Sequence, residues 1–156
     1  MMTSTAPAAA SIEPPDGIIL FAHGSRDPLW RGPIEAVATR IRAERAQLPV
    51  ACAYLELCEP SLPDATLTML SQLKMQSDDA INSVAISVDS IRARSSKPLN
   101  IRIVPMFLGM GKHAREDLPE LANALRLAHP DVSFEITPTV GEDERVTKLL
   151  AQLACA

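Results

Sequence analysis

The segment Ile101–Pro119 predicts a strand, a glycine-containing loop and the start of a helix, and this unit constrains the fold most. β-branched residues dominate its first part, which favours a strand, and Gly109 and Gly111 free the backbone where the chain must turn. Apolar residues then recur at positions 118, 121, 122 and 125, the spacing of one helix face. His113 therefore lies at the start of the predicted helix, just after the loop that follows the strand. In an open parallel sheet, ligands bind beyond the carboxyl ends of the strands.

Similar units precede and follow this segment. The apolar run Gly17–Ala22 is typical of a strand covered on both faces, and a helix is expected from Pro33. Capping boxes at Ser61–Asp64 and Thr139–Glu142 predict the starts of two further helices. The remaining predicted strands are Pro49–Leu57 and Val132–Ile136.

This alternation of strands and helices predicts an α/β fold, a three-layer sandwich around a mostly parallel four-stranded sheet. The length suits one domain over residues 17–156, with a disordered tail over residues 1–16, which are rich in Ala, Pro, Ser and Thr. Residues 75–98 are predicted to form a helical insertion, because apolar residues follow helical spacing at positions 81, 84, 85, 88 and 91. The stretch VAISV taken alone also fits a strand.

Composition and charge exclude several classes of function. The net charge of −4 and the aromatic content of 3% argue against nucleic-acid binding. No apolar run approaches the length of a membrane span, and the start does not resemble a signal peptide, so a cytoplasmic protein is expected. The three cysteines form no CxxC pair, which argues against a disulfide framework and favours core thiols at Cys52 and Cys58.

Polar residues follow each predicted strand and should meet at one edge of the sheet. Two histidines, His23 and His113, and the carboxylate of Glu56 make a plausible site for a divalent metal, because imidazole suits Fe, Co, Ni and Zn. Each of the three also has an ordinary structural interpretation, as a loop, helix-start or strand-end residue. His129 is interpreted as a helix-end residue, and Met106 and Met110 are expected to fill the core.

Basic residues surround the two histidines on an otherwise acidic chain. Any one of them is ordinary surface charge, but four around one mouth indicate an anionic ligand, with carboxylate as the expected partner. Phosphate is the rival, although no Walker or GxGxxG motif follows the first strand. The four residues are Arg26, Arg31, Lys112 and Arg115.

The chain resembles the small CbiX-type sirohydrochlorin chelatases, the class II chelatases. The resemblance rests on AHGSRDP together with FLGMGKHAREDLP, and on YLELCEPSLPDA and TPTVGEDERV in the same order. It implies ATP-independent insertion of Co²⁺, Fe²⁺ or Ni²⁺ into an octacarboxylate tetrapyrrole, with no cofactor beyond this metal substrate. Cobalamin and siroheme synthesis are the two pathways implied.

By motif match, His23 and His113 correspond to the metal-binding, catalytic histidines, and Glu56 to a supporting acid. The resemblance also implies substrate binding by Ser25, Arg26, Lys112 and Arg115. A chain of this length matches one half of the larger relatives, which implies a symmetric homodimer. The segment 75–98 departs from the family pattern. Alternatives are a metal-binding or metal-delivery protein, and a histidine-dependent hydrolase or phosphatase. The sequence contains no GxSxG motif in support of the last alternative.

Overall fold

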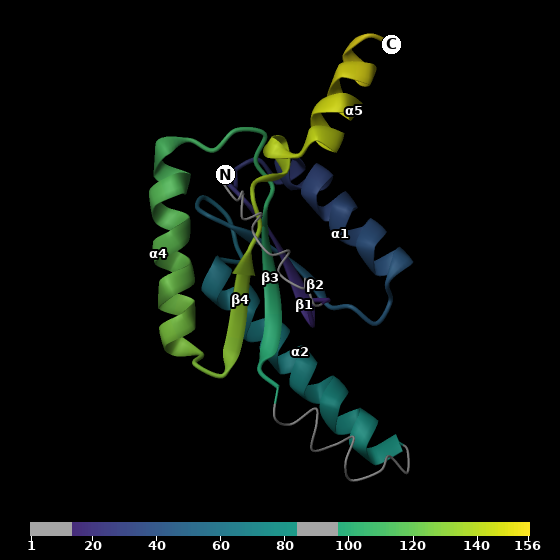
Figure 1. Ribbon diagram of the computed structural model, residues 1–156, viewed down its shortest axis with the longest axis vertical. Helices are drawn as coiled ribbons and strands as arrows, with labels where there is room; N and C mark the ends of the chain where they lie inside the picture. Colours follow the sequence, from purple (N-terminus) through teal and green to yellow (C-terminus); the bar gives the residue numbers. More distant parts are fainter. Residues whose placement is uncertain (1–13, 84–96) are drawn as a thin grey trace, which may run out of the picture.

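The computed structural model describes residues 14–83 and 97–156 of the chain (Figure 1). Four strands form one sheet in the order β2-β1-β3-β4, and every pair is parallel. The predicted α/β class and parallel sheet are therefore confirmed. The strands are β1 (Gly17–Ala22), β2 (Val50–Tyr54), β3 (Leu99–Pro105) and β4 (Val132–Ile136).

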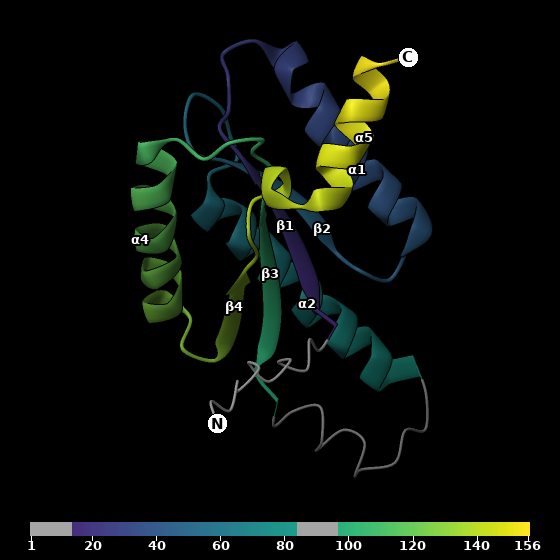
Figure 2. The same ribbon diagram turned by 45° about the horizontal axis from the view of Figure 1, so that its top comes forward.

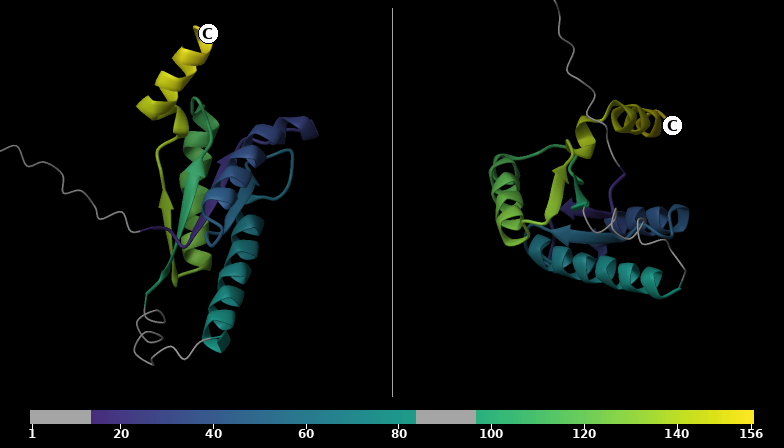
Figure 3. Two further views of the ribbon diagram at one scale, coloured as in Figure 1. Left: turned by 90° about the vertical axis from the view of Figure 1, so that its right-hand side faces the viewer. Right: turned by 60° about the horizontal axis from the view of Figure 1, so that its bottom comes forward.

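Helices cover both faces of this sheet, which makes the three layers visible in Figure 3. α2 (Leu62–Ser83) and α4 (Lys112–Ala128) lie on one face, and α1 (Gly32–Glu44) lies on the other. Because side chains alternate along a strand, Ile19 and Phe21 face α2 and α4, whereas Leu20 packs with Ala38 of α1. The larger core therefore lies between the sheet and the pair α2 and α4.

The helix starts agree with the sequence in one case and correct it in another. Ser61 precedes α2 as predicted, and its hydroxyl donates to Asp64 at 2.6 Å. The predicted capping box at Thr139 is wrong. Thr139 is 2% exposed, so its hydroxyl must find a hydrogen-bond acceptor within the protein. It donates to the carbonyl of Phe107, which lies closer than the carbonyl of Pro105. Asp143 is the real N-cap of the last helix, α5 (Glu144–Ala154).

Asp143 caps α5 by accepting the backbone N–H of Arg145 at 2.8 Å. The Arg145 guanidinium also donates to this carboxylate, and these hydrogen bonds lower the pKa of Asp143 to about 2. α5 then runs beyond the carboxyl edge of the sheet, as Figures 1 and 3 show. No residue of α5 is buried.

Two predicted segments fall partly outside the described residues. Of the tail over 1–16, residues 1–13 lie outside. Asp16 lies within, and its carboxylate and N–H pair with the backbone of Asn100 at the start of β3. Of the insertion over 75–98, α2 continues as far as Ser83, and residues 84–96 lie outside. None of the described helices combines the length and apolarity that a bilayer span requires.

Tyr54, at the end of β2, has a buried phenol hydroxyl. It is 2% exposed, and its hydroxyl forms no hydrogen bond within the described residues. Burial raises the pKa of Tyr54 from 10.0 to about 12. The unfolded chain therefore loses this proton at lower pH than the folded chain, so the free energy of unfolding should fall as the pH rises from about 10 to about 12.

Tyr54→Phe should remove this alkaline dependence and stabilise the fold at neutral pH by about 1 kcal/mol, because it deletes an unsatisfied hydroxyl. The sequence contains one tyrosine, so the absorbance of tyrosinate reports on Tyr54 alone. Urea unfolding at several pH values measures the stability of both proteins. A native titration midpoint at an ordinary phenol pKa would contradict the predicted burial effect.

Candidate active site at the carboxyl edge of the sheet

The loops that follow the four strands lie at one edge of the sheet (Figures 1 and 2). Backbone hydrogen bonds connect them there. Glu56 N–H donates to the carbonyl of His23 at 3.0 Å, which joins the loops after β1 and β2. Met106 N–H donates to Phe21 at 2.7 Å, and Gly141 N–H donates to Phe107 at 2.9 Å. The polar residues predicted to meet at this edge therefore stand on one connected backbone framework.

His23 directly follows β1 and is half-buried. Its ring packs against the ring of Phe107, with centroids 4.5 Å apart and planes tilted by 54°. The next residue, Gly24, has φ of +94°, and a Cβ there would stand 1.9 Å from the carbonyl oxygen of Glu56. Only glycine fits this turn, which brings the loops after β1 and β2 into close contact.

His113 lies in the first turn of α4, one residue after the helix begins, and its side chain is exposed. The buried Ala114 and Leu118 anchor this turn on the core. The Glu56 side chain is also exposed at the same edge. Within the described residues, no three His, Cys, Asp or Glu side chains are grouped closely enough to hold a metal. His23 and His113 thus follow β1 and begin α4 at the same sheet edge, and their binding of a metal stays a prediction.

The basic residues predicted around the histidines differ in their partners. Lys112 Nζ lies 3.9 Å from Glu116, and Arg31 lies 3.9 Å from Glu35. Long, exposed pairs of this kind contribute little, so they compete weakly with an anionic ligand. The side chains of Arg26 and Arg115 are also exposed.

Ser25 has a local role in the loop that leads from His23. Its hydroxyl oxygen accepts the Asp27 N–H at 3.1 Å. Asp27 in turn accepts the N–H of Leu29 at 2.9 Å and caps the short 3₁₀ helix η1 (Pro28–Arg31). Ser25 therefore helps to set the path of the loop that carries Arg26 and Arg31.

Sequence reasoning missed Phe107 at this edge and assigned Thr139 to a helix cap. Phe107 carries the ring contact to His23, and Thr139 holds the Phe107 carbonyl. A signal for Phe107 existed, since it is one of only three phenylalanines and stands just after a strand that leads to the site. Met106 and Met110 pack against the core, and His129 caps the C-terminus of α4, as predicted.

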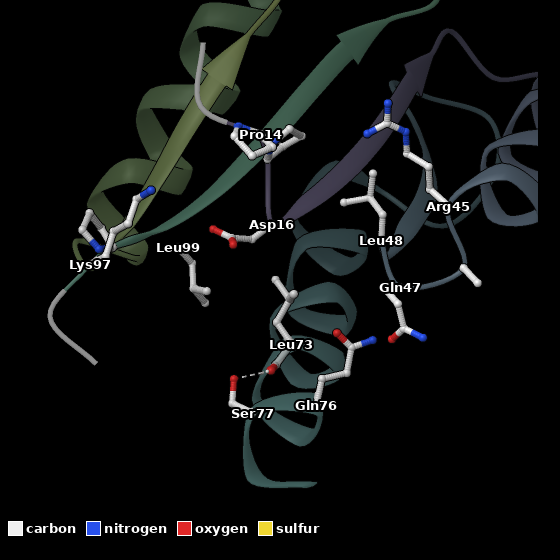
Figure 4. Close-up of a pocket in the computed structure, with 13 residues that line it drawn as sticks. Pro14, Asp16, Arg45, Gln47, Leu48, Leu73, Gln76, Ser77, Lys97 and Leu99 are labelled. Atoms are coloured by element: carbon white, nitrogen blue, oxygen red, sulfur yellow. Dashed lines mark hydrogen bonds between the residues drawn. The ribbon is translucent and has the colours of Figure 1, made fainter. Parts of the chain in front are cut away.

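A hollow lies at the opposite edge of the sheet, where the strands begin (Figure 4). Its volume is about 670 Å³, and its wall includes Asp16, Arg45, Leu73 and Lys97. None of the residues predicted for the metal site lines it. The chemistry expected from the sequence is thus concentrated at the other edge.

The comparisons with known proteins agree with this fold. A structure from Marinobacter aquaeolei VT8, described as a cobalamin (vitamin B12) biosynthesis CbiX protein, has a TM-score of 0.63 and 27% identity, and the match covers 90% of this chain and 94% of that one. The sirohydrochlorin chelatase SirB from Bacillus subtilis subspecies spizizenii, in complex with cobalt, also has a TM-score of 0.63, at 20% identity. That match covers 88% of this chain but 49% of SirB, so the likeness is to one half of a larger fold.

Comparison of the amino-acid sequence identifies relatives of the same kind. A sirohydrochlorin cobaltochelatase of Methanothermobacter thermautotrophicus is 29% identical over 109 residues, which are 70% of this chain and 59% of that protein. One from Methanopyrus kandleri is 24% identical over 67% of this chain and 56% of its own length. The match thus spans under two thirds of either relative. The CbiX family model matches residues 17–77 and 82–155, nearly all of the described domain, and the chain therefore belongs to the CbiX family.

Proposed function

We propose that this protein inserts a divalent metal, Co²⁺ or Fe²⁺, into sirohydrochlorin without ATP, in cobalamin or siroheme biosynthesis. The observation that carries the proposal is that a chain of the CbiX family has His23 and His113 in the loop and helix start at one sheet edge. Relatives named sirohydrochlorin cobaltochelatase support the choice of substrate. Ni²⁺ is a further metal that imidazole ligands accept.

In this proposal the two imidazoles hold the metal ion and receive protons. Insertion requires the ion to lose its water shell and the macrocycle to lose two pyrrole N–H protons. Neutral imidazole binds such ions and accepts protons near neutral pH. The open coordination of a two-histidine site leaves positions for the pyrrole nitrogens. Glu56, whose backbone N–H bonds to His23, is assigned a supporting role in carrying protons to solvent.

The basic side chains at the same edge supply the contacts to the substrate's carboxylates. Arg26 and Arg115 are exposed there, and guanidinium groups pair carboxylates in bidentate fashion. Lys112 is only loosely paired with Glu116, so it adds a third positive charge. Ser25, in the same loop as Arg26, offers a hydroxyl to the substrate in addition to its bond with Asp27. Together these groups would fix the macrocycle over the ion.

The test is a chelatase assay on purified full-length protein with sirohydrochlorin and Co²⁺, Fe²⁺ or Ni²⁺ supplied separately. Insertion changes the visible spectrum of the tetrapyrrole, and the protein should accelerate this change. A rate equal to that of metal and tetrapyrrole alone would refute the proposal. Binding of Co²⁺ without any affinity for the tetrapyrrole would instead favour the alternative, a metal-binding or metal-delivery protein.

We further propose that the working form is a homodimer. The apolar side of α5 supports this, because Leu149, Leu150 and Leu153 are 54%, 43% and 65% exposed. Burying such side chains contributes roughly 1.5–3 kcal/mol each, so a second copy that covers α5 would be stabilised. The coverage of 49% of SirB agrees with a chain that forms one half of a two-part cleft. The cytoplasmic location expected from the sequence remains a prediction, which cell fractionation tests.

A charge on the apolar side of α5 should separate the dimer. Light scattering after size exclusion should give about twice the chain mass of 16.8 kDa for the wild type, and half that value for Leu149→Glu combined with Leu153→Glu. Leu127→Glu on α4, where the leucine is 85% exposed, is the matched control and should remain dimeric. A wild-type protein of monomeric mass with full activity would contradict the proposed dimer.

A further inference from the structure

We propose that Phe107 is a positioning residue for His23, a role that rests on the proposed function of that histidine. The two ring centroids lie 4.5 Å apart, whereas the other ring pairs within residues 14–83 and 97–156 lie 6.0–6.5 Å apart. A benzene ring this close, tilted by 54°, restricts how far the imidazole can turn about its side-chain bonds. Phe107 therefore limits the directions in which the His23 nitrogens can point.

His23 needs such a support because its ring has no hydrogen bond to residues 14–83 or 97–156. A metal-binding histidine usually donates its second ring N–H to a carboxylate or carbonyl, and this bond fixes the ring plane. Among the described residues, neither nitrogen of the His23 imidazole has a hydrogen-bond partner, although its backbone carbonyl accepts from Glu56. Packing against Phe107 thus takes the place of the usual hydrogen bond. It also leaves the unprotonated ring nitrogen available, first for the ion and then, once the ion has passed to the macrocycle, for a pyrrole proton.

Phe107 is itself held from two sides, by β1 and by the segment that follows β4. Its ring is 3% exposed and meets Phe21 of β1 edge-on, with centroids 6.0 Å apart. Its carbonyl accepts the N–H of Gly141 at 2.9 Å and the hydroxyl of the buried Thr139. A Cβ at Gly141 would stand 1.8 Å from the carbonyl oxygen of Leu108, so this crossing is as close as backbone allows. These contacts make Phe107 a rigid support rather than a mobile cover.

Positioning of this kind should affect catalysis more than tetrapyrrole binding. Bonds from imidazole to a metal are directional, and loss of the groups that orient metal ligands typically costs 10- to 100-fold in metal affinity or activity. Phe107→Leu keeps an apolar side chain in the core but removes the ring face. We expect it to lower kcat and Co²⁺ affinity about tenfold, with KM for the tetrapyrrole within about twofold of the wild type.

Phe134→Leu is the matched control. Phe134 belongs to the same core cluster, is 5% exposed and also lies beside a histidine, His129, which is outside the site. It should lose comparable stability yet keep kcat and Co²⁺ affinity within about twofold. Phe107→Tyr, which retains a ring, should restore most of the kcat lost in Phe107→Leu. Equal losses in Phe107→Leu and Phe134→Leu, or no rescue by the ring, would show that Phe107 only fills the core.

Nuclear magnetic resonance of the imidazole nitrogens separates this inference from the proposed function. The chain has three histidines, and His23→Gln identifies the His23 signals. In Phe107→Leu, these signals should shift and their Co²⁺-induced changes should need about tenfold more metal, while the signals of His129 stay unchanged. This readout requires no tetrapyrrole. A protein without chelatase activity would refute the proposed function, whereas unchanged His23 signals in Phe107→Leu would refute the role of Phe107.

Discussion

His113→Ala should reduce metal insertion into sirohydrochlorin by at least about 100-fold, because it removes one of the two imidazoles proposed to hold the ion and receive protons. The side chain is exposed in the first turn of α4, so the stability of the protein should change by no more than about 0.5 kcal/mol. Steady-state kinetics with Co²⁺ and urea unfolding of the same preparation measure the two effects.

His129→Ala is the control for this experiment, since His129 lies at the opposite end of the same helix. It should keep turnover within about twofold of the wild type. His23→Ala should lose as much activity as His113→Ala, and the double variant should lose little more, because residues that act as one unit are not additive. Full turnover in both single variants would mean that the ion is held by other residues.

The arrangement that brings these histidines to one edge could be predicted from the sequence, because it follows from chain topology. The apolar run of β1 is bounded by polar residues and appears in the structure with the predicted bounds, Gly17–Ala22. Parallel strands joined through helices must end at the same edge, which decides where His23 and His113 lie relative to the sheet. The periodicity of apolar residues and the chain topology were therefore sufficient to place both histidines at this edge.

Contacts between loops could not be predicted in the same way. Thr139 matched a capping box by spacing, but its hydroxyl is buried against the carbonyl of Phe107, and Asp143 caps α5 instead. Local sequence shows which residues can cap a helix, whereas the tertiary position of the loop decides which one does. The ring contact between His23 and Phe107 joins residues 84 positions apart and has no local signature of its own.

The last helix illustrates a further limit. The apolar residues of α5 recur at the spacing of one helix face, at Val146, Leu149, Leu150 and Leu153. The spacing of apolar residues predicts which face of a helix is apolar, but it does not predict which surface packs against that face. In the described chain this side remains exposed, and only a second molecule or another surface can remove it from water. The spacing of residues within one chain therefore cannot identify the surface that covers α5.

Gly24→Ala should destabilise the protein by about 3 kcal/mol or more and lower its activity strongly. The φ of +94° is unfavourable for any residue with a Cβ, and the new Cβ would stand 1.9 Å from the Glu56 carbonyl oxygen. Because that carbonyl is backbone, relief requires the loops after β1 and β2 to separate. This movement would break the bond from Glu56 N–H to the His23 carbonyl and displace the imidazole.

Gly109→Ala is the matched control for Gly24→Ala, because Gly109 stands in the loop after β3 and a Cβ there meets no atom within 4 Å. It should change the free energy of unfolding by no more than about 0.5 kcal/mol. Urea unfolding compares the two variants, and Co²⁺ titration followed through the His23 signals reports whether the imidazole has moved. If Gly24→Ala is as stable and active as Gly109→Ala, the close contact between the loops after β1 and β2 does not fix the position of His23.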